Sequence, residues 1–292
     1  MLSPIGRGVI DLDQPAPVFR RQNHRAENRL NAPGRQGERA AVSLYFYIAS
    51  SLFVFLFSGV TAMAGVGAAF LFVPFFYYMG VPLSEAVPTA LLLNAVSLSF
   101  AAVNYQRGKL VNWQYGVPIL VTAVVLSPVG ARLTPYVNKG LLLGMFAAFL
   151  VFAGGMMLFH QARPRDVEPN SGTRVATCVG VGGVAGFLGG LLGVGGGNII
   201  VPALNWVGLD PKVAAGTSAL VVVFSSFSGF LGHVSLGGIE PRFVVTMALM
   251  AAGGSMVGSQ LMKTRVSGSQ LKRVIGVVLW LVAAKMILDL RK

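Results

Sequence analysis

Long apolar stretches separated by short polar turns make up most of the chain after residue 42. A helix of about 20 apolar residues crosses the hydrocarbon core of a bilayer, and most of these stretches reach about that length. We therefore expect membrane-crossing helices over residues 43–60, 86–104, 114–134, 140–159, 175–192, 212–234, 242–262 and 271–289. The pattern predicts an all-α polytopic membrane protein with about eight transmembrane helices.

Glycine interrupts the stretch Gly186–Leu204, which reads GFLGGLLGVGGGNIIVPAL. Each glycine in a helix interior costs about 1 kcal/mol relative to alanine, and several occur together here. We expect the helix to break at Gly193–Gly197. A half-helix should follow over residues 198–207.

A second copy of this segment, Gly59–Phe76, aligns with the first without gaps at an offset of 128 residues. It predicts another break at Gly65–Ala69 and a half-helix over residues 70–79. We interpret the chain as two tandem four-helix repeats, each with a glycine-broken helix. The boundaries are residues 43–159 for the first membrane repeat, 160–174 for a polar linker and 175–292 for the second membrane repeat. Four crossings return the chain to its starting side, so we expect both repeats to have the same orientation in the membrane.

Composition supports the membrane class. Hydrophobic residues make up 54% of the chain and charged residues only 11%, compared with about 25% charged residues in a typical soluble domain. The first 42 residues differ, since residues 1–41 hold seven arginines and four acidic residues without apolar periodicity. This composition predicts a disordered basic N-terminal tail over residues 1–42.

The distribution of basic residues suggests an orientation. We expect a multi-pass protein of the cell inner (plasma) membrane with its N-terminus in the cytoplasm, since cytoplasmic loops carry an excess of lysine and arginine. On that topology the basic cytoplasmic residues are Arg107, Lys109, Arg163, Arg165, Arg174 and Arg242. Four others fall outside and count against it: Lys263, Arg265, Lys272 and Arg273.

The two glycine breaks are the strongest candidates for a binding site. Backbone groups at membrane depth must be satisfied by protein or by a wet cavity, so two related breaks favour one shared cavity. A helix that begins at Ala68 or Gly197 would direct free N–H groups and the positive end of its dipole into this space, which suits an anion. The competing interpretation is that the glycines only allow helices to approach closely.

Charge also favours an anionic substrate. Transported cations usually require acidic ligands within the membrane. Outside the tail and the linker, the acidic residues lie in loops or at predicted helix ends: Glu85, Asp210, Glu240 and Asp289. Lys285 lies inside the last apolar stretch, and we expect its side chain to reach the membrane surface.

The candidate site combines backbone positions at the breaks with polar side chains on and beside them. The backbone cradle is Gly65, Gly67, Ala68, Gly193, Gly195, Gly196 and Gly197. The side-chain donors are Thr89, Asn94, Ser97, Asn198, Thr217, Ser218 and Ser225. Hydroxyl and amide groups can donate to an oxyanion without a fixed counter-charge, although a serine in a membrane helix often bonds its own backbone instead. Asn198 matches Phe70 in the first copy, so we expect the two halves of the site to differ.

Enzymatic motifs are absent from the sequence. The segment GVGGGN lacks the Gly-Lys-Ser/Thr ending of a phosphate-binding loop and the last glycine of a dinucleotide fingerprint. Ser228 and His233 lie on one predicted helix with an angle of about 140° between them, so they cannot form a Ser–His pair. With Cys178 as the only cysteine, no thiolate metal cluster can form. We expect no catalysis, no cofactor and no metal site.

The pattern resembles the sulfite exporter TauE/SafE family of eight-helix transporters. The residues that carry the resemblance are Gly193-Val194-Gly195-Gly196-Gly197 with Val201-Pro202, and Ala214-Ala215-Gly216-Thr217-Ser218. The resemblance covers residues 43–290. The first copy departs from the pattern with Ala68 and Ala69 in place of glycines, and with Val87-Pro88-Thr89-Ala90 in place of the Val-Gly-Thr-Ser type. The resemblance implies a carrier of small sulfur oxyanions or sulfonates.

We therefore expect a secondary transporter that binds sulfite or an organosulfonate at the paired breaks and works by alternating access between the repeats. The expected partners are a small anionic substrate and the lipid bilayer, with no nucleic acid, and small lipid-facing residues would permit a homodimer. Two alternatives remain open. One is a membrane scaffold without transport, and the other is a permease for another small solute such as a divalent cation.

Overall fold

The structure is a computed structural model that describes residues 33–159, 171–233, 241–264 and 268–290. Residues 1–49 and residues 50–292 form two separate units, and the packing described below concerns the second unit. Residues 1–32 of the expected disordered tail lie outside the described residues. From Pro33 onward the chain is already helical, which suits the good helix formers Arg, Gln, Glu and Ala in this stretch.

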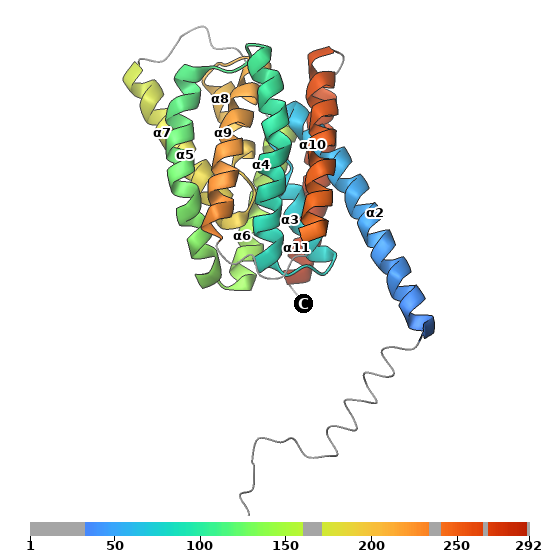
Figure 1. Cartoon of the computed structure of the whole chain (residues 1–292). Coiled ribbons are helices and arrows are strands. Elements are labelled where there is room, and N and C mark those ends of the chain that lie inside the picture. The colour runs from blue at the N-terminus through green and yellow to red at the C-terminus, as the bar shows by residue number, and fades with distance from the viewer. Residues whose placement is uncertain (1–32, 160–170, 234–240, 265–267, 291–292) are drawn as a thin grey trace, which may run out of the picture. The chain divides into compact units, whose positions relative to one another are not determined.

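The described chain contains ten α-helices and one short 3₁₀ helix (Figure 1). The first five α-helices are α2 (Pro33–Ala64), α3 (Ala69–Tyr78), α4 (Leu83–Arg107), α5 (Trp113–Leu133) and α6 (Lys139–Phe159), with the 3₁₀ helix η1 (Thr134–Tyr136) before α6. The other five are α7 (Ser171–Leu192), α8 (Gly197–Trp206), α9 (Pro211–Gly232), α10 (Pro241–Thr264) and α11 (Gly268–Leu290).

Seven of these helices are long and apolar enough to cross a membrane within the described residues. The outward face of α5 shows why a bilayer is the required surroundings, because it exposes a valine at every fourth position: Val117, Val121, Val125 and Val129. Such a continuous apolar stripe is unfavourable in water. The expectation of an all-helical polytopic membrane protein is confirmed.

Both predicted helix breaks are present, and the helix bounds recur at the offset of the sequence match. Residues 65–68 separate α2 from α3, and residues 193–196 separate α7 from α8. The helices α8, α9 and α10 each begin 128 residues after α3, α4 and α5, respectively. This regularity supports the interpretation of two repeats.

Equivalent helices of the two repeats run in opposite directions. On the pair α4 and α9, Asn94 lies against Ser226 while Leu91 lies against Gly229, so residue numbers rise on one helix as they fall on the other. The pair α6 and α11 shows the same relation, since Val151 contacts Trp280 and Leu158 contacts Gly276. The expectation that both repeats have the same orientation is therefore wrong.

The reason lies at the glycine breaks, where the chain turns back. Helix α2 runs parallel to α10 and α10 runs parallel to α4, whereas α3 runs antiparallel to α4. The residue pairs that show these directions are Phe55 with Gly254, Gly59 with Gly258, Ser97 with Ser255, Asn104 with Ser259 and Asn94 with Ala68. Because α3 returns toward the side where α2 began, α4, α5 and α6 add an odd number of crossings before the second repeat. An odd number inverts the copy.

This topology changes the charge count used for orientation. Arg107 lies where α4 ends and Arg174 lies where α7 begins, and these two helix ends are on the same side of the bundle. Arg242 lies where α10 begins. Because α10 runs parallel to α4, its beginning is on the opposite side. The sequence argument had placed all three on the side of the N-terminus. That grouping is wrong, so the count no longer supports a cytoplasmic N-terminus.

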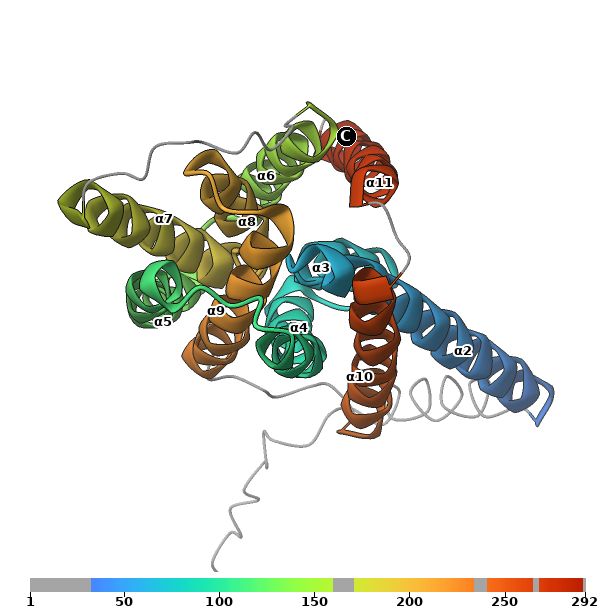
Figure 2. The same ribbon diagram turned by 90° about the horizontal axis from the view of Figure 1, so that it is seen from above.

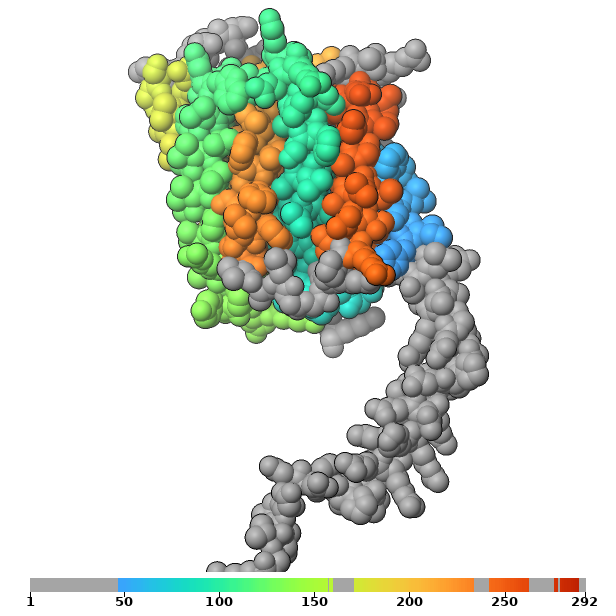
Figure 3. Space-filling view, in the orientation of Figure 1, coloured from blue at the N-terminus to red at the C-terminus, as the bar shows by residue number. Residues whose placement is uncertain are grey.

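The repeats interlock through their central helices. Seen from above, α4 and α9 lie side by side in the centre, α5 and α7 flank α9, and α10 flanks α4 (Figure 2). Figure 3 shows α5, α9, α4 and α10 as adjacent columns on one face. Small residues allow this close packing, as Gly182, Gly186 and Gly190 of α7 lie directly against the backbone of α5.

Candidate functional site

The two glycine breaks meet each other inside the bundle. A side chain at Gly197 would overlap the carbonyl oxygen of Val66, and one at Gly65 would overlap the carbonyl oxygen of Ala215 on α9. Residues 65–68 and 193–196 are all buried. The two breaks therefore form one contiguous region beside the middle of α4 and α9.

Left-handed backbone explains why glycine occurs at the breaks. Gly67 has a φ of 75° and its equivalent Gly195 has a φ of 77°, a region that other residues rarely adopt. The third glycine of the second break, Gly196, has a φ of 76° and caps α8, whereas Ala68 caps α3 with a φ of −109°. The departure of the first copy from the glycine pattern thus gives a different backbone conformation.

Asn94 joins the two breaks. Its Oδ1 accepts hydrogen bonds from the N–H groups of Ala68 at 2.7 Å and Ala69 at 3.2 Å, and its Nδ2 donates to Ser226 Oγ at 2.9 Å. A side chain at Gly195 would also run into Asn94 Nδ2. Asn94 therefore caps the first half-helix and occupies the N–H groups that the sequence analysis assigned to a substrate.

The second break has no equivalent cap. Val222 stands where the offset places the counterpart of Asn94, and its methyl group would lie 3.2 Å from a side chain at Gly195. Across the part of the chain that the structure describes, no hydrogen bond is made by the N–H groups of Gly196, Gly197 or Asn198. These are the free donors of an α-helix N-terminus, and α8 is long enough to carry a dipole.

Three of the predicted polar side chains are buried without a partner. Asn198 is 2% exposed, and neither its Nδ2 nor its Oδ1 has a hydrogen-bond partner among the described residues. The same holds for the hydroxyl groups of Ser97 and Ser218, which are fully buried. Burying an unpaired polar group costs about 1–3 kcal/mol, so unpaired groups on α8 and on the two central helices favour a ligand near the breaks.

Ser218 lies on the face of α9 that touches both breaks. It follows Ala215 by three residues and precedes Val222 by four, spacings that place all three on one side of the helix. Ala215 contacts Gly65 and Val222 contacts Gly195. Ser97 lies one turn beyond Asn94 on α4.

Other predicted donors are engaged within the protein. Thr217 Oγ1 accepts a hydrogen bond from the Asn112 N–H at 2.9 Å, which links α9 to the start of α5. Ser225 Oγ donates to its own helix at the Val222 carbonyl at 3.4 Å, the alternative that serine offers in membrane helices. Thr89 is buried, and no hydrogen bond of its side chain is found among the described residues.

Sequence reasoning missed three residues that shape the region: Ser226, Val222 and Ala215. The offset of 128 pairs Asn94 with Val222, and this polar-to-apolar change between copies was a usable signal.

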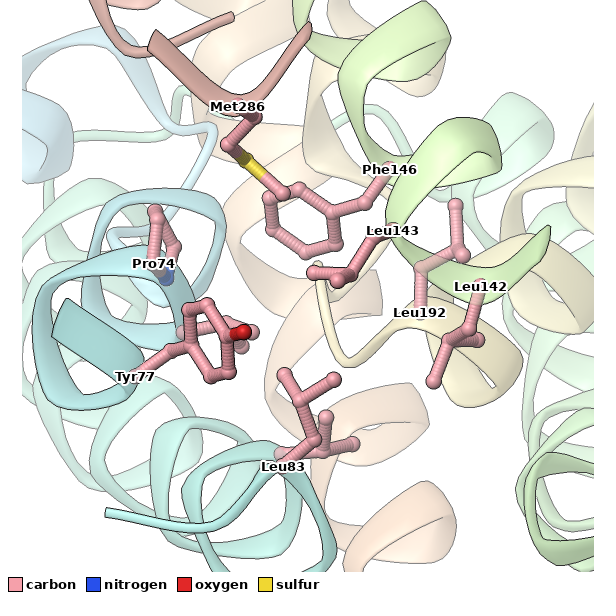
Figure 4. A pocket seen from close by; sticks show the side chains of 10 residues that line it. Pro74, Tyr77, Leu83, Leu142, Leu143, Phe146, Leu192 and Met286 are labelled. Carbon is pink, nitrogen blue, oxygen red and sulfur yellow. The ribbon is translucent and has the colours of Figure 1, made fainter. Parts of the chain in front are cut away.

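A small apolar pocket approaches the second break from the end of the bundle where α4 begins (Figure 4). Pro74 and Tyr77 of α3 face Leu143 and Phe146 of α6 across it, with Met286 of α11 on a third side. The other lining residues are Val73, Leu83, Val87, Leu142 and Leu192. Val73 and Val87 also contact Gly193, the first residue of the second break. The pocket thus ends against this break.

Comparison with known proteins places the chain in a family. A family model described as "Sulfite exporter TauE/SafE" matches residues 50–286. The probable membrane transporter protein YunE of Bacillus subtilis is 24% identical over 255 residues, which cover 79% of this chain and 93% of that protein. The probable membrane transporter protein YdhB of the same organism is 25% identical over 215 residues, covering 72% of this chain and 87% of that protein.

Sulfite exporter TauE/SafE family protein 1 of Arabidopsis thaliana is 38% identical over 80 residues, which cover 27% of this chain and 18% of that protein. No solved structure matches the chain. The family match spans both glycine breaks and nearly all of the membrane-crossing helices. The protein is a multi-pass membrane transporter that belongs to the TauE/SafE family.

Proposed function

We propose that the protein carries a small sulfur-containing oxyanion, sulfite or an organosulfonate, across the plasma membrane, and that the anion binds at the second glycine break. The observation that carries this proposal is the difference between the breaks. Asn94 caps α3 from α4, whereas Val222 leaves the start of α8 uncapped. An uncapped helix N-terminus in a buried region is suited to an anion.

The donors around this position suit release as well as binding. The N–H groups of Gly196 and Gly197, the amide of Asn198 and the hydroxyl of Ser218 are all neutral. Neutral donors can stabilise an oxyanion without forming a buried ion pair, whose rupture would be costly. We propose that the inverted repeats expose this site to either side of the membrane in turn, as in other transporters built from inverted repeats.

Flux into proteoliposomes tests the proposal, with radiolabelled sulfite, sulfate, thiosulfate and short sulfonates offered under imposed proton and sodium gradients. The decisive variant is Val222→Asn, which gives the second break the cap that the first already has. Its side chain should bind the free N–H groups, so sulfite or sulfonate flux should fall at least tenfold while the thermal stability stays equal or rises. Val222→Ala, which cannot form the cap, is the matched control and should retain most of the flux.

Two results would reject the proposal at different levels. Normal flux in a folded Val222→Asn protein would remove the second break as the binding position. Movement of none of the sulfur anions by the wild-type protein would remove the substrate class.

A further inference from the structure

Two lysines lie near the residues of the apolar pocket, and each is placed over a tyrosine of α3. Lys139 Nζ, at the start of α6, lies 5.4 Å from the centre of the Tyr77 ring, and Tyr77 lines the pocket. Lys285 Nζ lies 3.9 Å from the centre of the Tyr78 ring. Lys285 precedes the lining residue Met286 on α11. The aromatic rings hold both cations by cation–π contact.

The two lysines have no acidic partner among the side chains that the structure describes. Neither lysine forms an ion pair with a described side chain, and the side chain of Asp289, four residues after Lys285 on α11, lies outside the described ones. Glu85 lies on α4 two residues from each of the lining residues Leu83 and Val87. Residues two apart on a helix point to opposite faces, so Glu85 lies on the face of α4 opposite these two. Among the described side chains, the two lysines are therefore cations without an acidic partner.

Each repeat contributes one of the two lysines, and neither lysine has a basic counterpart at the matching position of the other repeat. The offset of 128 pairs Lys139 with Ser267 and Lys285 with Met157. The tyrosine pair likewise matches Asn205 and Trp206. An inverted repeat would place an equivalent approach at the opposite end of the bundle, and that approach lacks this charge pair.

We propose that this pocket is the vestibule through which the anionic substrate reaches the second break from one side of the membrane, with Lys139 and Lys285 as the residues that select negative charge. The proposal rests on the proposed function, because it takes the second break as the destination. The path is short: Leu192 lines the pocket and is followed directly by Gly193. A mouth of one charge sign with apolar walls concentrates ions of the opposite sign.

The single cysteine of the chain makes a direct test feasible. In a Cys178→Ala background, Leu143→Cys places one thiol in the pocket, and the protein is studied in lipid nanodiscs so that both ends are accessible. The thiol is modified with an anionic sulfonatoethyl methanethiosulfonate or with a cationic trimethylammonioethyl methanethiosulfonate. The ratio of the two rates, divided by the ratio for a free small thiol, measures the charge preference of the vestibule.

We expect this normalised ratio to favour the anionic reagent by about tenfold, within the range known for electrostatic focusing. The double variant Lys139→Gln with Lys285→Gln should bring it close to one. Arg132→Gln removes an exposed positive charge at the end of α5, on the same end of the bundle, and should leave the ratio unchanged. Leu83→Cys provides a second pocket thiol if Leu143→Cys does not fold.

A ratio that is the same with and without the two lysines overturns the proposal, as does the absence of labelling at both pocket thiols. The reagents report on the vestibule without any transport. If the labelling ratio favours the anionic reagent and depends on the two lysines, but the protein moves no sulfur anion, only the proposed function is rejected. If the protein moves sulfur anions but the labelling ratio is the same with and without the two lysines, only the vestibule is rejected.

Discussion

Asn94 Nδ2 donates a hydrogen bond to Ser226 Oγ at 2.9 Å, and this bond ties the middle of α4 to its inverted counterpart α9. The same side chain caps α3 through its Oδ1. One residue therefore satisfies one glycine break and links both repeats.

Replacing Asn94 should cost stability in proportion to these contacts. We expect Asn94→Ala to lower the free energy of unfolding by about 2–4 kcal/mol, because it removes a helix cap and leaves buried polar groups unpaired. Thermal unfolding in detergent measures the change. Asn104→Ala breaks another Asn–Ser bond, to Ser259 at the edge of the bundle, and should cost less. Equal losses for the two variants would contradict a special role for Asn94.

Substitutions of two serines of α9, Ser218 and Ser226, should separate effects on binding from effects on folding. Ser218 Oγ has no partner among the described residues, whereas Ser226 Oγ holds Asn94. Ser218→Ala should keep the melting temperature and raise the KM for the transported anion about fivefold to tenfold, the loss of one neutral hydrogen bond. Ser226→Ala should lower the melting temperature, because Asn94 loses its acceptor.

The reverse pattern would mean that Ser218 supports the fold and that the substrate binds elsewhere. Asn198→Leu extends the comparison, since both polar atoms of Asn198 are unpaired in the described chain. It should abolish transport without a loss of thermal stability.

Glycines at helix contacts should differ from glycines in open positions. A side chain at Gly130 would overlap the Phe187 carbonyl, and one at its equivalent Gly258 would overlap the Gly59 carbonyl. Alanine at either position should cost about 1–3 kcal/mol through overpacking. The controls Gly144→Ala and Gly155→Ala have no atoms within 4 Å of the added carbon and should be neutral or stabilising by up to about 1 kcal/mol. Chemical denaturation in mixed micelles compares the four variants.

The inverted topology predicts which loops share a side of the membrane. In the Cys178→Ala background, Lys109→Cys and Lys212→Cys should be labelled by an impermeant maleimide from the same side of sealed vesicles. Asn138→Cys should be labelled from the opposite side. All three positions are exposed at helix ends. Labelling of Lys109→Cys and Lys212→Cys from opposite sides would restore the same-way-up arrangement and reject the inverted one.

The helix pattern was readable from the sequence because apolar length and clustered glycines act locally. The predicted half-helix begins at residue 70, and α3 begins at Ala69, a difference of one residue. The direction of α3 was not readable, because a break only shows that the helix stops. Whether the chain continues or turns back depends on tertiary contacts such as that between Ala68 and Asn94.

The candidate site was predicted only in part for the same reason. Asn198, Ser97 and Ser218 were selected as polar residues near the breaks, and all three have buried atoms without partners in the described structure. Asn94 was selected on the same grounds but serves as a cap. Sequence shows which side chains can donate hydrogen bonds, whereas packing decides which of them are already used.

The antiparallel relation of α4 and α9 has an energetic consequence. If the halves of such a protein were identical in sequence, exchanging their conformations would yield the same molecule facing the other way, and both facings would be equally populated. Asn94 and Val222 are unlike residues at matching positions, so this degeneracy is lifted. If the protein alternates between two facings as we propose, a bond that Asn94 makes in only one of them would add to the free-energy gap between the facings and so favour one resting direction.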